Sequence, residues 1–150
     1  MKNLLCFLFF CVSTQIIAQK KSIYDEALAR KIGADEYGMK NYVFCILKTG
    51  NNTTATKEEK QKLFEGHMQN IERLVNEGKL VVAGPFMKND RNYRGIFIFN
   101  CSTIEEAQNL VETDPAVKAK IFDVELTLWY SSASLVMIKE LHERITKTKP

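Results

Sequence analysis

The sequence predicts an α+β domain whose elements follow the order β-α-β-β-α-β, which is the ferredoxin-like arrangement. Four segments are rich in apolar and strand-forming residues: 42–47, 80–86, 93–99 and 122–129. Two intervening segments repeat apolar residues at helical spacing, and only a short polar turn separates the second and third strands. A further C-terminal helix is expected near residues 134–145.

The first helix of this pattern is expected over about residues 55–76, with Gly78 at its end. Its apolar residues form one stripe: Leu63, Phe64, Met68, Ile71, Leu74 and Val75. His67 lies on the same side, four residues after Leu63 and four before Ile71. An imidazole at this position is at least partly buried and needs a hydrogen-bond partner.

The second helix is expected to begin at Ser102 or Thr103, because Thr103 and Glu106 have the spacing of a capping box. Its buried face consists of four residues: Ile104, Ala107, Leu110 and Val111. Asp114 precedes Pro115, which is a standard start for a short third helix. Helix capping alone is sufficient to explain an aspartate at this position.

Two helices on one face of a four-stranded sheet leave the other face uncovered. Aromatic side chains remain on the strands of that face and at the end of the last strand. A homodimer that stacks two such faces would bury them, so we expect a homodimer through the open face of the sheet.

The composition indicates one globular domain, with 150 residues, 45% of them apolar and 26% charged. The 21 basic and 18 acidic residues are interspersed, whereas a nucleic-acid surface needs a concentrated basic stripe, so we expect no nucleic-acid partner. Phosphate loops, nucleophile elbows and dinucleotide fingerprints are absent from the sequence. Two separated histidines and two strand cysteines do not make a zinc site, so we expect no metal and no cofactor.

Residues 1–18 have the layout of a secretory signal peptide. Lys2 is followed by an apolar run to Val12, a polar break and a cleavage position after Ala18. The run is shorter than the roughly 20 residues of a membrane span. We therefore expect an exported chain, periplasmic or extracellular, with no membrane span after cleavage; the alternatives are an uncleaved anchor and a buried strand.

Cleavage would remove two of the four cysteines and leave Cys45 and Cys101. An exported protein can pair two cysteines as a disulfide. Both residues nevertheless lie within apolar strand patterns, where a buried free thiol is the simpler interpretation.

Several landmarks between His67 and Trp129 occur together. His67 lies on a helix, Ala83-Gly84-Pro85 ends a strand, Asp114-Pro115 precedes a short helix, and the last strand ends Leu128-Trp129-Tyr130. In this combination the sequence resembles the YciI-like, or YCII-related, family. The resemblance divides the chain into a signal peptide (1–18), a lead-in (19–40) with a short helix that Gly33 ends, a YciI-like domain (41–130) and a helical tail (131–150).

The resemblance implies a dimeric α+β barrel of ferredoxin-like subunits and an active site built around a His–Asp pair. In this sequence the pair corresponds to His67 and Asp114. Four further residues are candidates for binding the substrate, two as the wall of a pocket and two as aromatic surfaces for a planar molecule: Gly84, Pro85, Tyr93 and Trp129. One branch of the family resembles muconolactone-isomerase-type enzymes and includes dehydrochlorinases of chlorinated hydroxyquinols, a substrate that is not transferred to this chain.

The favoured hypothesis is a small enzyme for elimination or isomerisation of a small organic molecule. Asp114 would hold one nitrogen of His67, and the other nitrogen would act as the general base or acid. A non-catalytic module that binds a small ligand is one alternative. A structural homodimer in which the pair is satisfied internally is another. The signal peptide, lead-in and tail depart from the family pattern and separate this chain from the roles of cytoplasmic members.

Overall fold

A computed structural model describes residues 23–148, so the predicted signal peptide lies outside the described residues. The described elements, in chain order, are α1 (Glu26–Ile32), β1 (Met39–Thr49), α2 (Lys57–Asn76), β2 (Leu80–Pro85), β3 (Tyr93–Phe99), α3 (Ile104–Val111), α4 (Pro115–Lys118), β4 (Phe122–Ser132), the 3₁₀ helix η1 (Ala133–Met137) and α5 (Ile138–Ile145).

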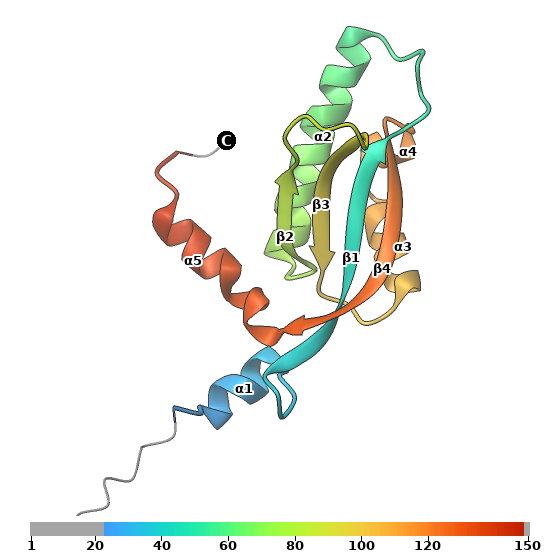
Figure 1. Cartoon of the computed structure of the whole chain (residues 1–150). Coiled ribbons are helices and arrows are strands. Elements are labelled where there is room, and N and C mark those ends of the chain that lie inside the picture. The colour runs from blue at the N-terminus through green and yellow to red at the C-terminus, as the bar shows by residue number, and fades with distance from the viewer. Residues whose placement is uncertain (1–22, 149–150) are drawn as a thin grey trace, which may run out of the picture.

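The four strands form one antiparallel sheet in the order β2-β3-β1-β4. β3 lies between β1 and β2, which run parallel to each other and are connected through α2. The helices α2, α3 and α4 lie together on one face of the sheet (Figure 1). The predicted ferredoxin-like α+β fold is confirmed, and α5 is the expected extra helix.

Helix capping differs in detail from the prediction. Thr103 caps α3 by accepting a hydrogen bond from the backbone N–H of Glu106, but the Glu106 carboxylate instead accepts a bond of 3.0 Å from Lys79. The predicted capping box is therefore only half formed. A complete capping box begins α2, where Thr56 and Glu59 each bond to the backbone of the other.

The core lies between the sheet and its helices. Val43, Cys45 and Leu47 alternate along β1 and are buried on the helix-facing side. The other buried members of the core are Leu74, Leu80, Phe97, Phe99, Cys101, Ala107, Val111, Ala116, Val117 and Phe122. Every second residue of the strands thus faces the helices, as the alternating pattern predicts.

β1 and β4 are longer than their apolar patterns predict. They pair along their whole length, beginning with Met39 opposite Ser132, whereas β3 joins β1 only from Val43 onward. The start of β1 and the end of β4 therefore extend past β3 as a two-stranded ribbon. The polar residues Lys40 and Asn41 in this ribbon explain why no apolar strand pattern marked it.

The tail covers one end of the sheet face that is opposite α2. η1 packs against β1 and β2. The hydroxyl of Tyr42, which is fully buried, lies 3.1 Å from the carbonyl of Ser132 and 3.2 Å from that of Ala133, and it donates to this pair of acceptors. Ile98 on the same face is also buried. The partly exposed remainder of this face includes Phe44, Ile46, Val82, Ile96 and Trp129.

α5 continues from this end of the sheet and exposes apolar side chains, with Leu141 and Ile145 exposed by 53% and 80%. Within residues 23–148, no helix combines the length and apolar character that crossing a membrane requires. The lead-in is tied to β4, because Asp35 accepts a hydrogen bond from the hydroxyl of Tyr130. Gly33 ends α1 in the left-handed conformation, as expected.

Both cysteines of the described chain are free thiols and are buried. Cys45 lies opposite Phe97 in the β1–β3 register, and Phe97 precedes Cys101 by four residues. Burial raises the pKa of the Cys45 thiol to about 12, and burial also raises the pKa of the Cys101 thiol. The structure therefore has the two buried thiols that their apolar surroundings predict.

Candidate active site

The fold brings His67 and Asp114 together, although 47 residues separate them in the sequence. His67 lies on α2 and Asp114 immediately precedes α4. The distance from His67 Nδ1 to Asp114 Oδ2 is 2.5 Å. The Asp114 side chain is fully buried and that of His67 is 11% exposed, so the contact is shielded from water.

The two carboxylate oxygens of Asp114 have different partners. Oδ1 accepts a hydrogen bond of 2.8 Å from the backbone N–H of Ala116 and so caps α4, while Oδ2 faces His67. Capping and pairing are therefore simultaneous roles of one side chain. Because a carboxylate only accepts hydrogen bonds, the hydrogen of this contact belongs to His67 Nδ1, which leaves Nε2 as the nitrogen available for proton transfer.

Aromatic rings enclose the imidazole on the sheet side. The His67 ring stacks on Phe97, with 5.8 Å between centroids and an interplanar angle of 25°, and lies 5.1 Å from the ring of Phe122. Phe64, one turn earlier on α2, contacts Phe122 edge-on and is 43% exposed. These contacts fix the ring plane and place an apolar rim beside a small exposed part of the imidazole.

α2 approaches α4 closely next to this pair, and a glycine permits the approach. A Cβ on Gly66 would lie 2.8 Å from Pro115 Cγ. Sequence reasoning missed Gly66, because a glycine inside a helix carries no mark of the neighbour it meets. Its position beside His67 was the available signal.

A second polar contact joins the same two segments. Asn70 Oδ1 lies 2.9 Å from Thr113 Oγ1 and 2.8 Å from Arg73 Nη2. Asn70 is 7% exposed, and its Nδ2 atom is buried without a hydrogen-bond partner among the described residues. Sequence reasoning missed Asn70 too, although a polar residue three positions after His67 on the apolar side of α2 was a usable signal.

The four predicted substrate-binding residues lie on strands of the sheet. Gly84 and Pro85 are in the last part of β2, opposite Ile96 and Gly95 of β3. Tyr93 begins β3 and contacts the ring of Phe86. None of the three makes a hydrogen bond or ring contact with His67 or Asp114 within residues 23–148.

Trp129 lies on the other face of the sheet. Its ring contacts Tyr42 and Phe44, and Phe44 alternates along β1 with the helix-facing Val43 and Cys45. The predicted role of Trp129 beside the His–Asp pair therefore has no geometric support within one subunit.

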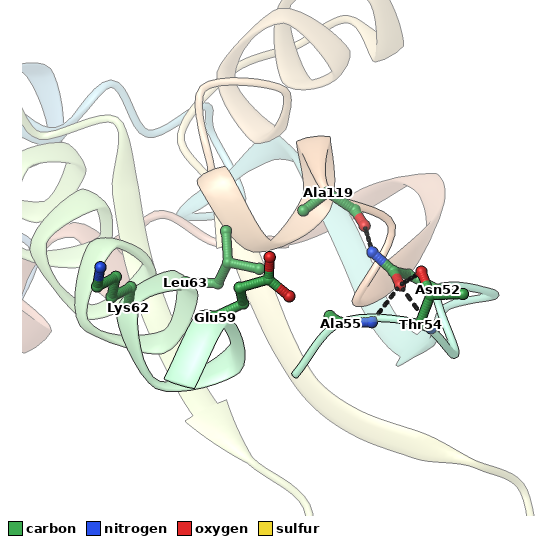
Figure 2. Close-up of a pocket in the computed structure, with 7 residues that line it drawn as sticks. All are labelled: Asn52, Thr54, Ala55, Glu59, Lys62, Leu63 and Ala119. Carbon is green, nitrogen blue, oxygen red and sulfur yellow. Dashed lines mark hydrogen bonds between the residues drawn. The ribbon is translucent and has the colours of Figure 1, made fainter. Parts of the chain in front are cut away.

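Two surface cavities are lined by neither member of the pair. One, of about 420 Å³, is formed by the loop before α2, the first turns of α2 and the end of α4 (Figure 2). Asn52 holds this loop by donating to the carbonyl of Ala119 and accepting from the N–H of Thr54 and of Ala55. Leu63, which lies one turn before His67 on α2, also lines this cavity.

A cavity of about 230 Å³ lies among residues of α3, α4 and β4, and it is lined by neither His67 nor Asp114. No group of three or more metal-ligating side chains occurs among the described residues. Among residues 23–148, the buried His67–Asp114 pair with its aromatic surround has the groups that proton transfer requires.

The YCII-related domain model matches residues 42–130, which is more than half of the chain, so the chain belongs to this family. The predicted membership is confirmed. No curated protein matches the chain significantly. Among solved structures the chain is similar to 5-chloro-2-hydroxyhydroquinone dehydrochlorinase from Burkholderia phenoliruptrix AC1100 in complex with 2,5-dihydroxybenzoquinone. The two are 22% identical, the match covers 58% of this chain and 90% of that chain, and the TM-score is 0.39.

Proposed function

We propose that this YCII-related protein is a small acid–base enzyme that eliminates from or isomerises a small organic molecule. His67 transfers the proton through Nε2, and Asp114 holds Nδ1. The observation that carries the proposal is the buried 2.5 Å contact between Nδ1 and Oδ2. Such a carboxylate fixes the tautomer of the ring and stabilises the imidazolium that forms when Nε2 takes a proton.

The surroundings of the imidazole indicate the class of substrate. Phe97 and Phe122 pack on its ring, and Phe64 adds a half-exposed aromatic edge. Aromatic walls favour planar, conjugated molecules. A conjugated molecule also suits the chemistry, since it delocalises the charge left when a base removes a proton from carbon.

A proton-exchange assay tests this proposal. Wild-type protein is incubated in deuterated buffer with a panel of enolisable cyclic 1,3-diketones, enol lactones and halogenated hydroxyquinols, and products are read by mass spectrometry. We expect deuterium incorporation, double-bond migration or halide release with at least one compound, and its loss in His67→Gln. The matched control is His142→Gln, which alters an exposed histidine of α5 and retains activity.

The same assay separates the alternatives. A compound that raises the unfolding temperature of the wild type but not of His67→Gln, and is recovered unchanged, indicates a binding module. Absence of both conversion and binding across the panel favours a structural role.

We also propose that the protein is a homodimer through the face of the sheet opposite α2. Apolar side chains on this face remain partly exposed in one subunit, among them Ile46, Ile96 and Trp129. Light scattering after size exclusion measures the mass: Ile96→Glu should halve the mass. Ile104→Glu, which changes a partly exposed residue at the start of α3, should not. A wild-type monomer contradicts the proposal.

Export is the third part of the proposal, and it rests on the pattern of residues 1–18. Mass spectrometry of the protein expressed from its full sequence should find a mature chain that begins after Ala18, outside the cytoplasm. An intact chain that begins at Met1 in the membrane fraction would indicate the uncleaved anchor instead.

A further inference from the structure

Two adjacent side-chain contacts connect α2 to the turn between α3 and α4. His67 reaches Asp114, and three residues later on the same helix Asn70 reaches Thr113. Residues three apart on a helix are neighbours on one face. Thr113 and Asp114, which follow each other in the turn, are thus held by two neighbouring side chains of α2. The Asn70–Thr113 contact therefore lies beside the proposed proton-transfer pair.

An asparagine at position 70 lowers the stability of the fold relative to an apolar side chain that packs there. It lies between the half-buried Leu63 and the buried Leu74 on the core side of α2, and its buried Nδ2 makes no hydrogen bond among the described residues. A buried polar group without a partner loses its hydration and gains nothing in return. A leucine would fill this position without that loss, so packing alone does not explain the asparagine.

The amide of Asn70 has one orientation. Arg73 can only donate hydrogen bonds, and its Nη2 lies 2.8 Å from Asn70 Oδ1, so the amide oxygen must face Arg73 and Thr113. Arg73 is held in turn by Glu77, whose carboxylate oxygens lie 2.9 and 3.0 Å from Nη1. The chain of contacts from Glu77 through Arg73 to Asn70 therefore presents a fixed acceptor to the Thr113 hydroxyl.

Thr113 connects this acceptor to the turn that carries Asp114. Its hydroxyl lies 2.9 Å from Asn70 Oδ1 and 2.7 Å from the carbonyl of Leu110, and it accepts a bond of 2.9 Å from Arg73 Nη2. The backbone N–H of Asp114 donates to the carbonyl of Val111 in the same turn. The side chain of Thr113 thus ties the end of α3 to α2 one residue before Asp114.

We propose that Asn70 is a positioning residue of the acid–base site: through Thr113 it fixes the turn that presents the Asp114 carboxylate to His67 Nδ1. This inference rests on the proposed function for its catalytic consequence, but its structural content is independent of any substrate. Loss of Asn70 loosens the contact between Asp114 and His67 while leaving the packing of α2 intact.

The experiment compares Asn70→Leu, Thr113→Val and the conservative Thr113→Ser in the full protein. The first readout is the low-field NMR signal of the His67 Nδ1 hydrogen and its exchange rate with water. The chain has only two histidines, and the signal is assigned by its loss in His67→Gln. The second readout is the unfolding temperature. The third is turnover of whichever panel compound the wild type converts.

We expect Asn70→Leu and Thr113→Val to unfold within a few degrees of the wild type, with the Nδ1 hydrogen broadened or exchanging at least tenfold faster. Thr113→Ser should keep the sharp signal. Turnover should fall about ten- to a hundredfold in the first two variants, the size of effect that a small misplacement of a catalytic group produces.

If the NMR signal of the His67 Nδ1 hydrogen is unchanged in both Asn70→Leu and Thr113→Val, the proposal is overturned. If it changes in Asn70→Leu alone, Asn70 does not act through Thr113, and that part of the proposal is overturned. Unfolding of both variants while Thr113→Ser remains folded assigns the contact to stability and also overturns it. A changed NMR signal in a protein that converts no panel compound would instead support the positioning role and count against the proposed function.

Discussion

Gly66 lies so close to Pro115 that a Cβ added to it would be 2.8 Å from Pro115 Cγ. Both residues are backbone neighbours of the His67–Asp114 pair, so the spacing of α2 and α4 sets the spacing of the pair. We expect Gly66→Ala to push these helices apart. The free energy of unfolding should fall by about 1–3 kcal/mol from overpacking, and the low-field hydrogen of His67 should exchange faster, as measured by urea unfolding and NMR.

Gly84→Ala is the matched control for this prediction. A Cβ on Gly84 meets no atom within 4 Å, and its backbone does not require the left-handed conformation. Its unfolding curve and NMR signal should match those of the wild type. Equal stability of the two glycine variants would show that α2 and α4 can separate freely, and so contradict the close-packing argument.

Asp114 allows its two roles to be separated by two substitutions. Asp114→Ala removes the cap of α4 and leaves His67 without its partner, so we expect a loss of about 2–4 kcal/mol in unfolding free energy. Asp114→Asn keeps an oxygen for the N–H of Ala116 and caps as well as aspartate. Its stability should therefore lie closer to that of the wild type.

The same Asp114→Asn substitution should nevertheless remove activity. An amide NH₂ facing His67 Nδ1 requires that nitrogen to accept, which moves the ring hydrogen to Nε2 and blocks it as a base. We expect turnover of a panel substrate to fall roughly 10³–10⁴-fold, as when a tautomer-fixing carboxylate is replaced in a catalytic triad. A folded Asp114→Asn protein with full turnover would rule out the tautomer-fixing role.

Sequence patterns predicted the elements that bury regular apolar faces. The apolar stripe of α2 and the alternation of apolar and polar residues along β4 are local periodic patterns, so the sequence predicted both elements. The two-stranded ribbon formed by the start of β1 and the end of β4 was not predicted, because backbone pairing rather than apolar burial holds its strands together. The carboxylate of Glu106 likewise found a partner, Lys79, that is distant in sequence.

At the site, the sequence suggested the pair but not its supports. Asp-Pro geometry predicted the cap, and the family resemblance suggested that Asp114 and His67 belong together. Gly66 and Asn70 act through residues more than 40 positions away, so their places beside His67 could mark them as candidates but could not name their partners. The position of Trp129 was readable in part, since it alternates with the apolar side of β4 and so belongs on the face opposite α2.

The buried thiols should react slowly with an alkylating or disulfide reagent. Burial raises the pKa of the Cys45 thiol to about 12 and also raises the pKa of the Cys101 thiol. Little thiolate therefore forms near neutral pH. We expect 5,5′-dithiobis(2-nitrobenzoate) to label neither residue in folded protein at pH 8 within minutes, and both at once in urea. Rapid labelling of folded protein that begins at Gln19, and so lacks Cys6 and Cys11, would contradict their burial; a Cys45→Ala variant shows which thiol is responsible.

Tyr42 gives the fold a sensitivity to alkaline pH. Burial raises its pKa to about 12 from an ordinary value of 10.0. Between these values the unfolded chain loses the phenol proton while the folded chain keeps it, so the free energy of unfolding falls as pH rises. The stabilisation is complete below pH 10 and is lost at about 1 kcal/mol per pH unit above it.

Tyr42→Phe should therefore flatten the alkaline limb of the stability curve. It gives up the hydrogen bond to the Ser132 or Ala133 carbonyl, about 1 kcal/mol at pH 8, but it has no proton to lose. Urea unfolding at pH 8, 10 and 11 measures both effects, with the exposed Tyr37→Phe as control. The Tyr42→Phe and wild-type curves should converge as pH rises, whereas the Tyr37→Phe curve should stay parallel to the wild type. A constant difference between Tyr42→Phe and wild type would mean that the phenol ionises equally in the folded and unfolded chains, and that the tail does not seal it from water.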